Sequence, residues 1–89
     1  MQITQQKLNQ VISLAKEYGA NRLILFGSAL DNPETANDLD IACDGIEGWK
    51  LYELGARLED DLKISLDLIP LSPPNSFTRL IEKRGRVLL

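Results

Sequence analysis

Two segments of the chain, residues 38–43 and 63–69, alternate polar and apolar side chains. A period of two is typical of a strand that turns one face toward the core and the other away from it. The stretch between them, residues 49–61, instead repeats leucine at helical spacing. A strand, a helix and a second strand in this order confine the chain to a fold in which helices pack on a sheet.

The flanking segments extend this pattern. Residues 4–18 have helical spacing, and residues 23–26 form a short apolar run that is typical of a buried central strand. The segment after this run is predicted as a loop with one helical turn, and a last helix begins after a cap at Asn75 or Ser76. With a final strand at residues 87–89, we predict an α/β (α+β) fold, a small mixed β-sheet with helices mainly on one face.

The length of 89 residues predicts a single domain, residues 1–89, near the lower limit of what folds alone. A homo- or hetero-oligomeric interface would therefore add usefully to its buried surface. No apolar run approaches the roughly 20 residues of a membrane span, and the first residues lack the pattern of a signal peptide. Because Cys43 is the only cysteine, we expect no internal disulfide and a cytoplasmic location.

The charge balance narrows the classes of ligand. The chain has 13 acidic and 10 basic residues and a net charge of -3. Domains that bind nucleic acid usually carry a basic stripe, so nucleic acid is not the expected ligand. An acidic chain is better suited to divalent cations or a basic partner. The absence of histidine excludes Ser-His-Asp and Cys-His nucleophilic sites, which leaves carboxylates, hydroxyls, amines and backbone dipoles for chemistry.

Asp38 and Asp40 are candidate metal ligands. Two residues apart on the predicted strand, they leave the same face with Cα atoms about 6.6 Å apart. At an effective dielectric of about 20, two ionised carboxylates at that distance repel by roughly 2.5 kcal/mol. A divalent cation relieves this repulsion, and Mg²⁺ favours one or two carboxylates together with phosphate oxygens. Glu59 and Asp61 have the same spacing, so a solvated surface pair is an alternative that the spacing alone leaves open.

Two further features favour the metal site. Asp67 interrupts an apolar stretch in the middle of a predicted strand, where an acid is disfavoured, and it lies in the row that faces away from the core. It can share a face with the other two acids if their strands are neighbours; an exposed position on an open sheet is the alternative. Gly27 and Ser28 follow the buried strand directly, where glycine lets the backbone approach a ligand and serine offers a hydroxyl and an N–H to phosphate oxygens. A simple turn that ends the strand is the alternative here.

Together, these residues predict two-metal phosphoryl or nucleotidyl transfer, in which one Mg²⁺ bridges a triphosphate and the other lowers the pKa of the attacking hydroxyl. The run Leu25-Phe26-Gly27-Ser28, followed by Asn37-Asp38-Leu39-Asp40-Ile41, resembles the G-S…D-x-D signature of the DNA polymerase beta-like nucleotidyltransferase superfamily. The short length, the acid at Asp67 and the ending Arg86-Val87-Leu88 are similar to its shortest branch, the minimal nucleotidyltransferase (MNT) domains.

This resemblance implies a nucleotidyltransferase-like fold and a role for each matching residue. Gly27 and Ser28 would bind the phosphates of ATP, and Asp38 and Asp40 would hold two Mg²⁺ ions. Asp67 would complete one metal site and help to activate the acceptor. Proteins of this branch are commonly paired with a HEPN-domain ribonuclease, which they neutralise as antitoxins, in characterised cases by transfer of AMP. The resemblance therefore implies an AMP-transferring antitoxin with a HEPN-domain partner.

One departure from the family pattern keeps a second function open. Many relatives have arginine directly after the serine, where this chain has Ala29, so a phosphate contact is missing. Lys63 is the candidate replacement on geometry. The alternative is a weak or inactive module that neutralises a HEPN protein by contact alone. Transfer to a small molecule is a third option, although relatives of that kind usually carry an extra helical domain, which these 89 residues do not include.

Two other side-chain types are expected to be structural. Cys43 lies in the core-facing row of its predicted strand, so we expect a small buried hydrophobe rather than a nucleophile. The aromatic side chains of Tyr18, Trp49 and Tyr52 are expected to lie in the core or to face a partner rather than to stack on a base.

Overall fold

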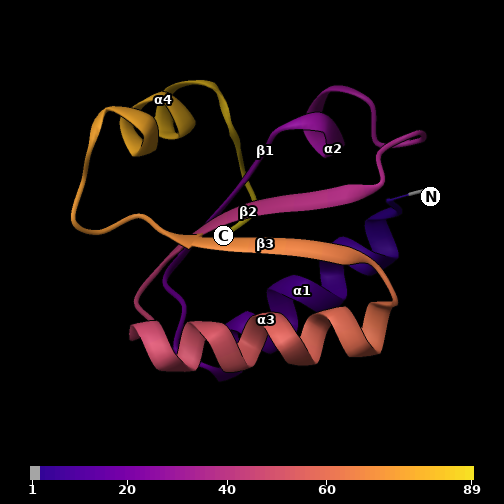
Figure 1. Ribbon diagram of the computed structural model, residues 1–89, viewed down its shortest axis with the longest axis horizontal. Coiled ribbons are helices and arrows are strands. Elements are labelled where there is room, and N and C mark those ends of the chain that lie inside the picture. Colours follow the sequence, from indigo (N-terminus) through magenta and orange to yellow (C-terminus); the bar gives the residue numbers. More distant parts are fainter. Residues whose placement is uncertain (1–2) are drawn as a thin grey trace.

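The computed structural model describes residues 3–89 (Figure 1). Its helices and strands follow the order α1 (Gln5–Glu17), β1 (Arg22–Phe26), α2 (Ser28–Asp31), β2 (Asp38–Asp44), α3 (Gly48–Leu62), β3 (Ser65–Pro70), α4 (Ser76–Arg84) and β4 (Arg86–Val87). The predicted order of elements is therefore confirmed. Within residues 3–89, no helix has the length and apolar character that crossing a bilayer requires.

The four strands form one mixed sheet in the order β3-β2-β1-β4. β1 is antiparallel to both β2 and β4, whereas β2 and β3 are parallel. Parallel neighbours need a crossover connection, and α3 supplies it between β2 and β3. The predicted small mixed sheet is thus observed, with β3 at one edge.

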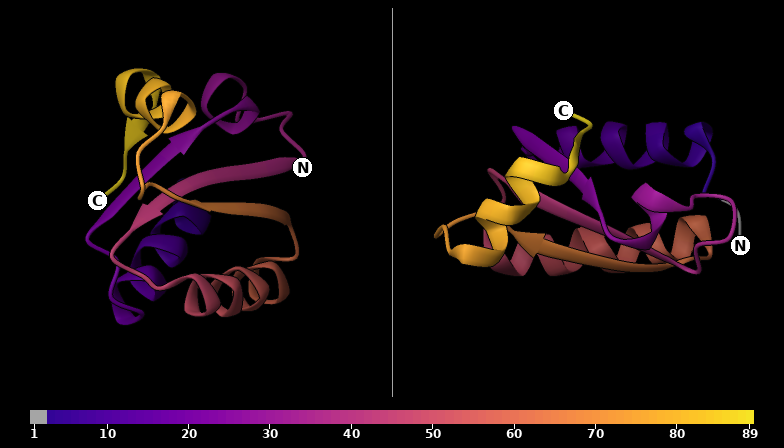
Figure 2. Two further views of the ribbon diagram at one scale, coloured as in Figure 1. Left: turned by 60° about the vertical axis from the view of Figure 1, so that its left-hand side comes forward. Right: turned by 90° about the horizontal axis from the view of Figure 1, so that it is seen from above.

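The main core lies between the sheet and the pair of helices α1 and α3, which cover the same face (Figure 2). In β2 this face receives Leu39, Ile41 and Cys43, as the alternation predicts. The facing apolar residues of the two helices are Leu8, Val11, Leu14, Ala15, Leu51, Leu54, Leu58 and Leu62. The burial of these side chains is the largest favourable contribution to folding.

The other face of the sheet is covered over only part of its area. There α4 packs on a smaller cluster in which Ile24, Ala42, Leu71 and Ile81 are buried. Both α2 and α4 lie on this side, opposite α1 and α3 (Figures 1 and 2). The prediction of helices mainly on one face is confirmed, because α1 and α3 are the two long helices.

Local side-chain bonds set several of the boundaries. The Thr4 hydroxyl accepts a hydrogen bond from the Lys7 N–H (3.2 Å) and so starts α1. Asn75 and Thr78 form a reciprocal capping box at the start of α4. At the end of α3, Lys63 adopts a left-handed conformation with φ of 56°. The prediction that Lys63 begins the next strand is therefore wrong, because this residue caps the helix and β3 starts only at Ser65.

The three aromatic side chains were predicted to lie in the core or to face a partner. Trp49 is 64% exposed and Tyr52 is 86% exposed, so neither belongs to the core. Both lie on α3, whose core-facing stripe is filled by leucines alone. Tyr18 is half-buried and packs against the main core.

Candidate active site

The three candidate aspartates lie on one face of two adjacent strands. The parallel register pairs Asp40 of β2 with Asp67 of β3, and it pairs Asp38 with Ser65. Neighbouring strands are about 4.8 Å apart, so the Asp40 and Asp67 side chains leave the sheet side by side. Their alternate neighbours Ala42 and Ile69 pack in the cluster under α4. The carboxylates therefore share the face of the sheet opposite α1 and α3.

The carboxyl group of Asp40 is the electrostatic centre of this group. Its pKa is raised above the ordinary value by partial burial, by the negative charges of Asp67 and Asp38, and by a side-chain hydrogen bond with Asp67. A cation bound between the carboxylates would offset the same repulsion.

The turn after β1 lies directly against the Asp40 carboxylate. Phe26 is the register partner of Asp40, and Gly27 follows it with φ of 77°. An added Cβ at Gly27 would overlap the Asp40 Oδ2 atom and lie 3.2 Å from its Cγ. Both the backbone conformation and the close approach therefore require glycine at this position.

Ser28 begins the short helix α2 beside this turn. The carbonyl oxygen of Gly27 accepts hydrogen bonds from the N–H groups of Leu30 (3.1 Å) and Asp31 (3.4 Å). The Ser28 side chain is exposed, so its hydroxyl is accessible beside the Gly27 turn. Gly27 and Ser28, which were predicted to bind phosphate, thus lie at the edge of the three aspartates.

Ala29, the residue after Ser28, lies in the main core rather than beside the aspartates. Its side chain is 1% exposed. An arginine side chain here would have to leave that core before it reached a phosphate. The predicted substitute, Lys63, lies at the end of α3, where its Nζ atom is 3.3 Å from Asp60 Oδ1. Lys63 is therefore paired with Asp60 rather than placed beside Asp38, Asp40 and Asp67.

The donor set suits Mg²⁺ that arrives with a triphosphate. Within residues 3–89, no three acidic, cysteine or histidine side chains converge into a ready metal cage. Mg²⁺ is commonly held by one or two carboxylates and by substrate phosphate oxygens, and it keeps several waters. The Asp40–Asp67 pair, with Asp38 two residues away and the Gly27 turn beside it, fits this mode of binding.

Two structural features near the site were not foreseen from the sequence. A hollow of about 690 Å³ lies between α3 and β3, and Asp67 is one of its lining residues. Glu59 of α3 accepts a hydrogen bond from the Leu66 N–H (3.1 Å), so it has a structural role in addition to its charge. The sequence signal for the hollow is the small pair Gly55-Ala56 in the middle of α3.

Cys43 takes no part in this site. Its side chain is 2% exposed in the main core, as predicted. Burial and the nearby charge of Asp44 raise the pKa of its thiol to about 11. A neutral buried thiol is a poor nucleophile.

Asp40 and Asp67 thus lie side by side on two parallel strands, and the Gly27 turn lies against Asp40. Neither a protein-family model nor a curated protein matches the sequence. Solved structures do match the fold. A crystal structure of the toxin–antitoxin MntA–HepT aligns with a TM-score of 0.75 and 22% identity over 97% of this chain and 72% of the matched chain.

Two further solved structures give the same result. One is a complex of a tri-AMPylated Shewanella oneidensis HEPN toxin with an MNT antitoxin, with a TM-score of 0.76 and 23% identity over 96% of this chain and 71% of the other. The second is a toxin–antitoxin with AMP-PNP, with a TM-score of 0.78 and 24% identity over 92% and 72%. The chain thus has the fold of the minimal nucleotidyltransferase antitoxins, which confirms the fold that the sequence resemblance implies.

Proposed function

We propose that this protein is a Mg²⁺-dependent nucleotidyltransferase that transfers AMP from ATP to a partner protein with a HEPN domain, as the antitoxin of a toxin–antitoxin pair. The observation that carries this proposal is the pairing of Asp40 with Asp67 beside the Gly27 turn. The shared fold adds support, because a similar solved complex contains a tri-AMPylated HEPN toxin and another contains AMP-PNP.

In this proposal, Asp38 and Asp40 hold two Mg²⁺ ions and Asp67 completes one of the two metal sites. Bound Mg²⁺ would supply positive charge to the triphosphate and lower the pKa of the acceptor hydroxyl. The Gly27 backbone and the Ser28 hydroxyl contact phosphate oxygens. Because Gly27 lies close to Asp40, its backbone is well placed for this contact. These residues then fix the α-phosphate next to the carboxylates.

Asp67 has the further task of orienting the acceptor. It lies on the edge strand, so an incoming hydroxyl can reach its carboxylate from outside the sheet. The hydroxyl oxygen forms a bond to the α-phosphorus while the bond from that phosphorus to the pyrophosphate oxygen breaks. Asp67 takes the hydroxyl proton and releases it to water, AMP remains on the acceptor, and pyrophosphate leaves.

A second function is favoured by one observation. Ala29 is buried in the core, so the chain lacks a cation at the position where the family pattern has arginine. A chain with a weakened triphosphate site can still neutralise a HEPN protein by direct contact. This alternative predicts that the HEPN protein is neutralised without ATP and without the three aspartates.

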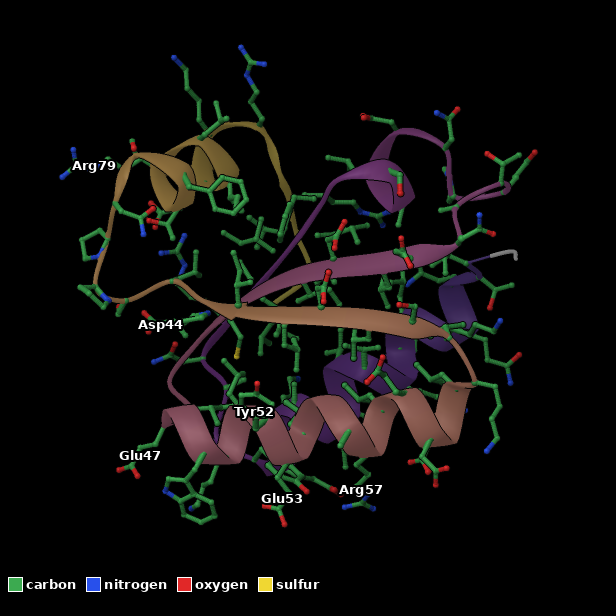
Figure 3. The ribbon with its side chains drawn as sticks, viewed as in Figure 1. Asp44, Glu47, Tyr52, Glu53, Arg57 and Arg79 are labelled. Atoms are coloured by element: carbon green, nitrogen blue, oxygen red, sulfur yellow. The ribbon has the colours of Figure 1, made fainter. Side chains whose placement is uncertain are left out.

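The experiment that separates the two functions incubates this chain with a HEPN-domain protein, labelled ATP and Mg²⁺. We expect label on the HEPN protein, and we expect its loss in Asp38→Asn and Asp40→Asn. Glu53→Gln is the matched control, because Glu53 is an exposed acid on α3 that points away from the sheet (Figure 3). If the HEPN protein is neutralised without label, and equally by both aspartate variants, the binding module is the correct function.

A further inference from the structure

The outer edge of β3 presents backbone groups for pairing. β3 is an edge strand of the sheet. The Leu66 N–H donates to Glu59 of α3, so it points away from β2. Because backbone groups alternate in direction along a strand, the N–H and C=O of Leu68 also point outward. Pro70 offers no N–H at the end of the strand. The edge is therefore protected at its two ends and available at Leu68.

The hollow beside this edge is lined mainly by apolar residues, and it shares Asp67 with the candidate active site. It measures about 690 Å³. The lining residues that matter here are Leu51, Tyr52, Gly55 and Ala56 of α3 and Asp67 and Leu68 of β3. The small side chains of Gly55 and Ala56 leave the space, and the exposed Tyr52 ring borders it between α3 and β3 (Figure 3). A chain lying along the β3 edge would meet the hollow on one side and the carboxylates on the other.

The charge of the hollow selects its occupant. The lining residues that carry a charge at neutral pH are Glu59 and Asp67, and both are acidic. The protein as a whole has a net charge of -3. A segment that carries a basic residue therefore complements this surface better than an acidic one.

We propose that an extended segment of the protein acceptor binds here as an added strand along β3, with its acceptor hydroxyl beside Asp67. This inference rests on the proposed function and specifies how the acceptor is recognised. Side chains opposite one another on adjacent strands lie about 4.5–5.5 Å apart, which brings a serine, threonine or tyrosine hydroxyl to the Asp67 carboxylate. That hydroxyl is the group whose oxygen bonds to the α-phosphorus and whose proton Asp67 takes, as pyrophosphate leaves.

The alternation of the added strand also fixes the residues next to the hydroxyl. They point to the opposite face of the sheet, where the apolar hollow lies between α3 and β3. The acceptor segment therefore has apolar residues on both sides of its hydroxyl residue and a basic residue within reach of Glu59. Main-chain hydrogen bonds at Leu68 would supply affinity, and the hollow would supply specificity.

The test fills the hollow without changing the carboxylates. Ala56→Trp puts a large side chain into the hollow, and Glu53→Trp adds the same side chain to the outward face of α3 as a matched control. We expect Ala56→Trp to lower kcat/KM for the HEPN protein by about tenfold or more, equivalent to at least about 1.4 kcal/mol. The affinity of Ala56→Trp for AMP-PNP with Mg²⁺ should equal that of the wild type. For Glu53→Trp, both kcat/KM and this affinity should equal the wild-type values.

Hydrogen exchange at Leu68 gives a readout that does not depend on transfer. The probe is a short synthetic peptide with a central tyrosine, a leucine on each side of it and a lysine three residues from it in both directions, so that the lysines share the face of the leucines. We expect it to slow exchange of the Leu68 amide, and we expect no slowing with a peptide whose leucines are replaced by aspartate. The HEPN protein itself should slow the same amide.

The outcomes separate the two proposals. If the wild type transfers AMP, and Ala56→Trp transfers it equally well with Leu68 unprotected by the HEPN protein, the added strand is wrong and the enzyme remains. If no AMP is transferred but Leu68 is protected by the HEPN protein, the groove is correct as a docking site and the enzymatic function is wrong.

Discussion

The two faces of the sheet are built from alternate residues of the same strands, yet they serve different ends. In β2, Leu39 and Ile41 are fully buried under α1 and α3. Their neighbours Asp38 and Asp40 face the other side, where the cover by α4 begins only at Ala42. One face contributes hydrophobic free energy, and the other keeps like charges together at a cost to stability. Adjacent residues of one strand therefore point to different faces, one that stabilises the fold and one that carries the candidate site.

The largest expected effect is on the face with the carboxylates. We expect Asp40→Asn to lower AMP transfer by roughly 10³-fold, equivalent to about 4 kcal/mol of transition-state stabilisation, because in the proposed function Asp40 is a metal ligand. The free energy of unfolding should not fall, because the substitution also removes the repulsion that raises the pKa of Asp40. Single-turnover transfer and denaturant unfolding measure the two quantities. If Asp40→Asn lost as much free energy of unfolding as a core variant, the face with the carboxylates would also be needed for stability, and the contrast between the two faces would be wrong.

The adjacent residue should behave in the opposite way. Leu39→Ala leaves a cavity in the main core, and we expect a loss of about 2–5 kcal/mol in the free energy of unfolding. The folded fraction should keep its affinity for AMP-PNP with Mg²⁺, because the substituted side chain faces α1 and α3. Urea unfolding and nucleotide titration at low temperature check the two parts. Lost affinity in a fully folded sample would mean that the faces are coupled.

The faces and their assignment were predictable because they depend on local periodicity. The alternation in residues 38–43 places Leu39 and Ile41 in the core and the aspartates opposite, and the structure agrees. The same reasoning assigned Asp67 to the row that faces away from the core. Its place beside Asp40 depended on the two strands being neighbours, as the parallel register shows them to be. Periodicity determines which way a side chain points, and this information is local to each strand.

The remaining features were not predictable because they depend on contacts between distant segments. Lys63 sits in an alternating stretch, but the end of α3 holds it in a left-handed cap, so tertiary structure overrides the pattern. The hollow beside Asp67 depends on where Gly55 and Ala56 of α3 cross β3. Likewise, the burial of Ala29 depends on how α2 packs on the core. A single sequence window can show that Gly55 and Ala56 are small, but it does not show which distant segment any of these residues contacts.

The glycine turn joins the two faces and should show an intermediate effect. Gly27→Ala places a side chain at φ of 77° and against the Asp40 carboxylate. We expect a loss of about 1–3 kcal/mol in the free energy of unfolding, because a strained backbone residue costs this much. We also expect weaker binding of AMP-PNP with Mg²⁺, since Asp40 must move. Gly48→Ala is the control, because an added Cβ at Gly48 meets nothing within 4 Å. Equal behaviour of the two variants would show that the turn does not need glycine.

The smallest expected effect is the pH dependence of stability. Because burial and the charges of Asp67 and Asp38 raise the pKa of Asp40 above its ordinary value of 3.8, the folded protein binds more protons at this site than the unfolded chain. The stabilising contribution of Asp40 is thus fully present below that value, and it is lost as the pH rises through the higher pKa of the folded state. Asp40→Asn lacks this titration, so the free energy of unfolding of the wild type should fall relative to the variant over that range. Urea unfolding of both proteins across the acidic range measures the difference. A difference that grows in favour of the wild type with rising pH would mean that a cationic group of the protein, rather than the neighbouring acids, controls Asp40, and the carboxylate face would then have no need of a metal ion.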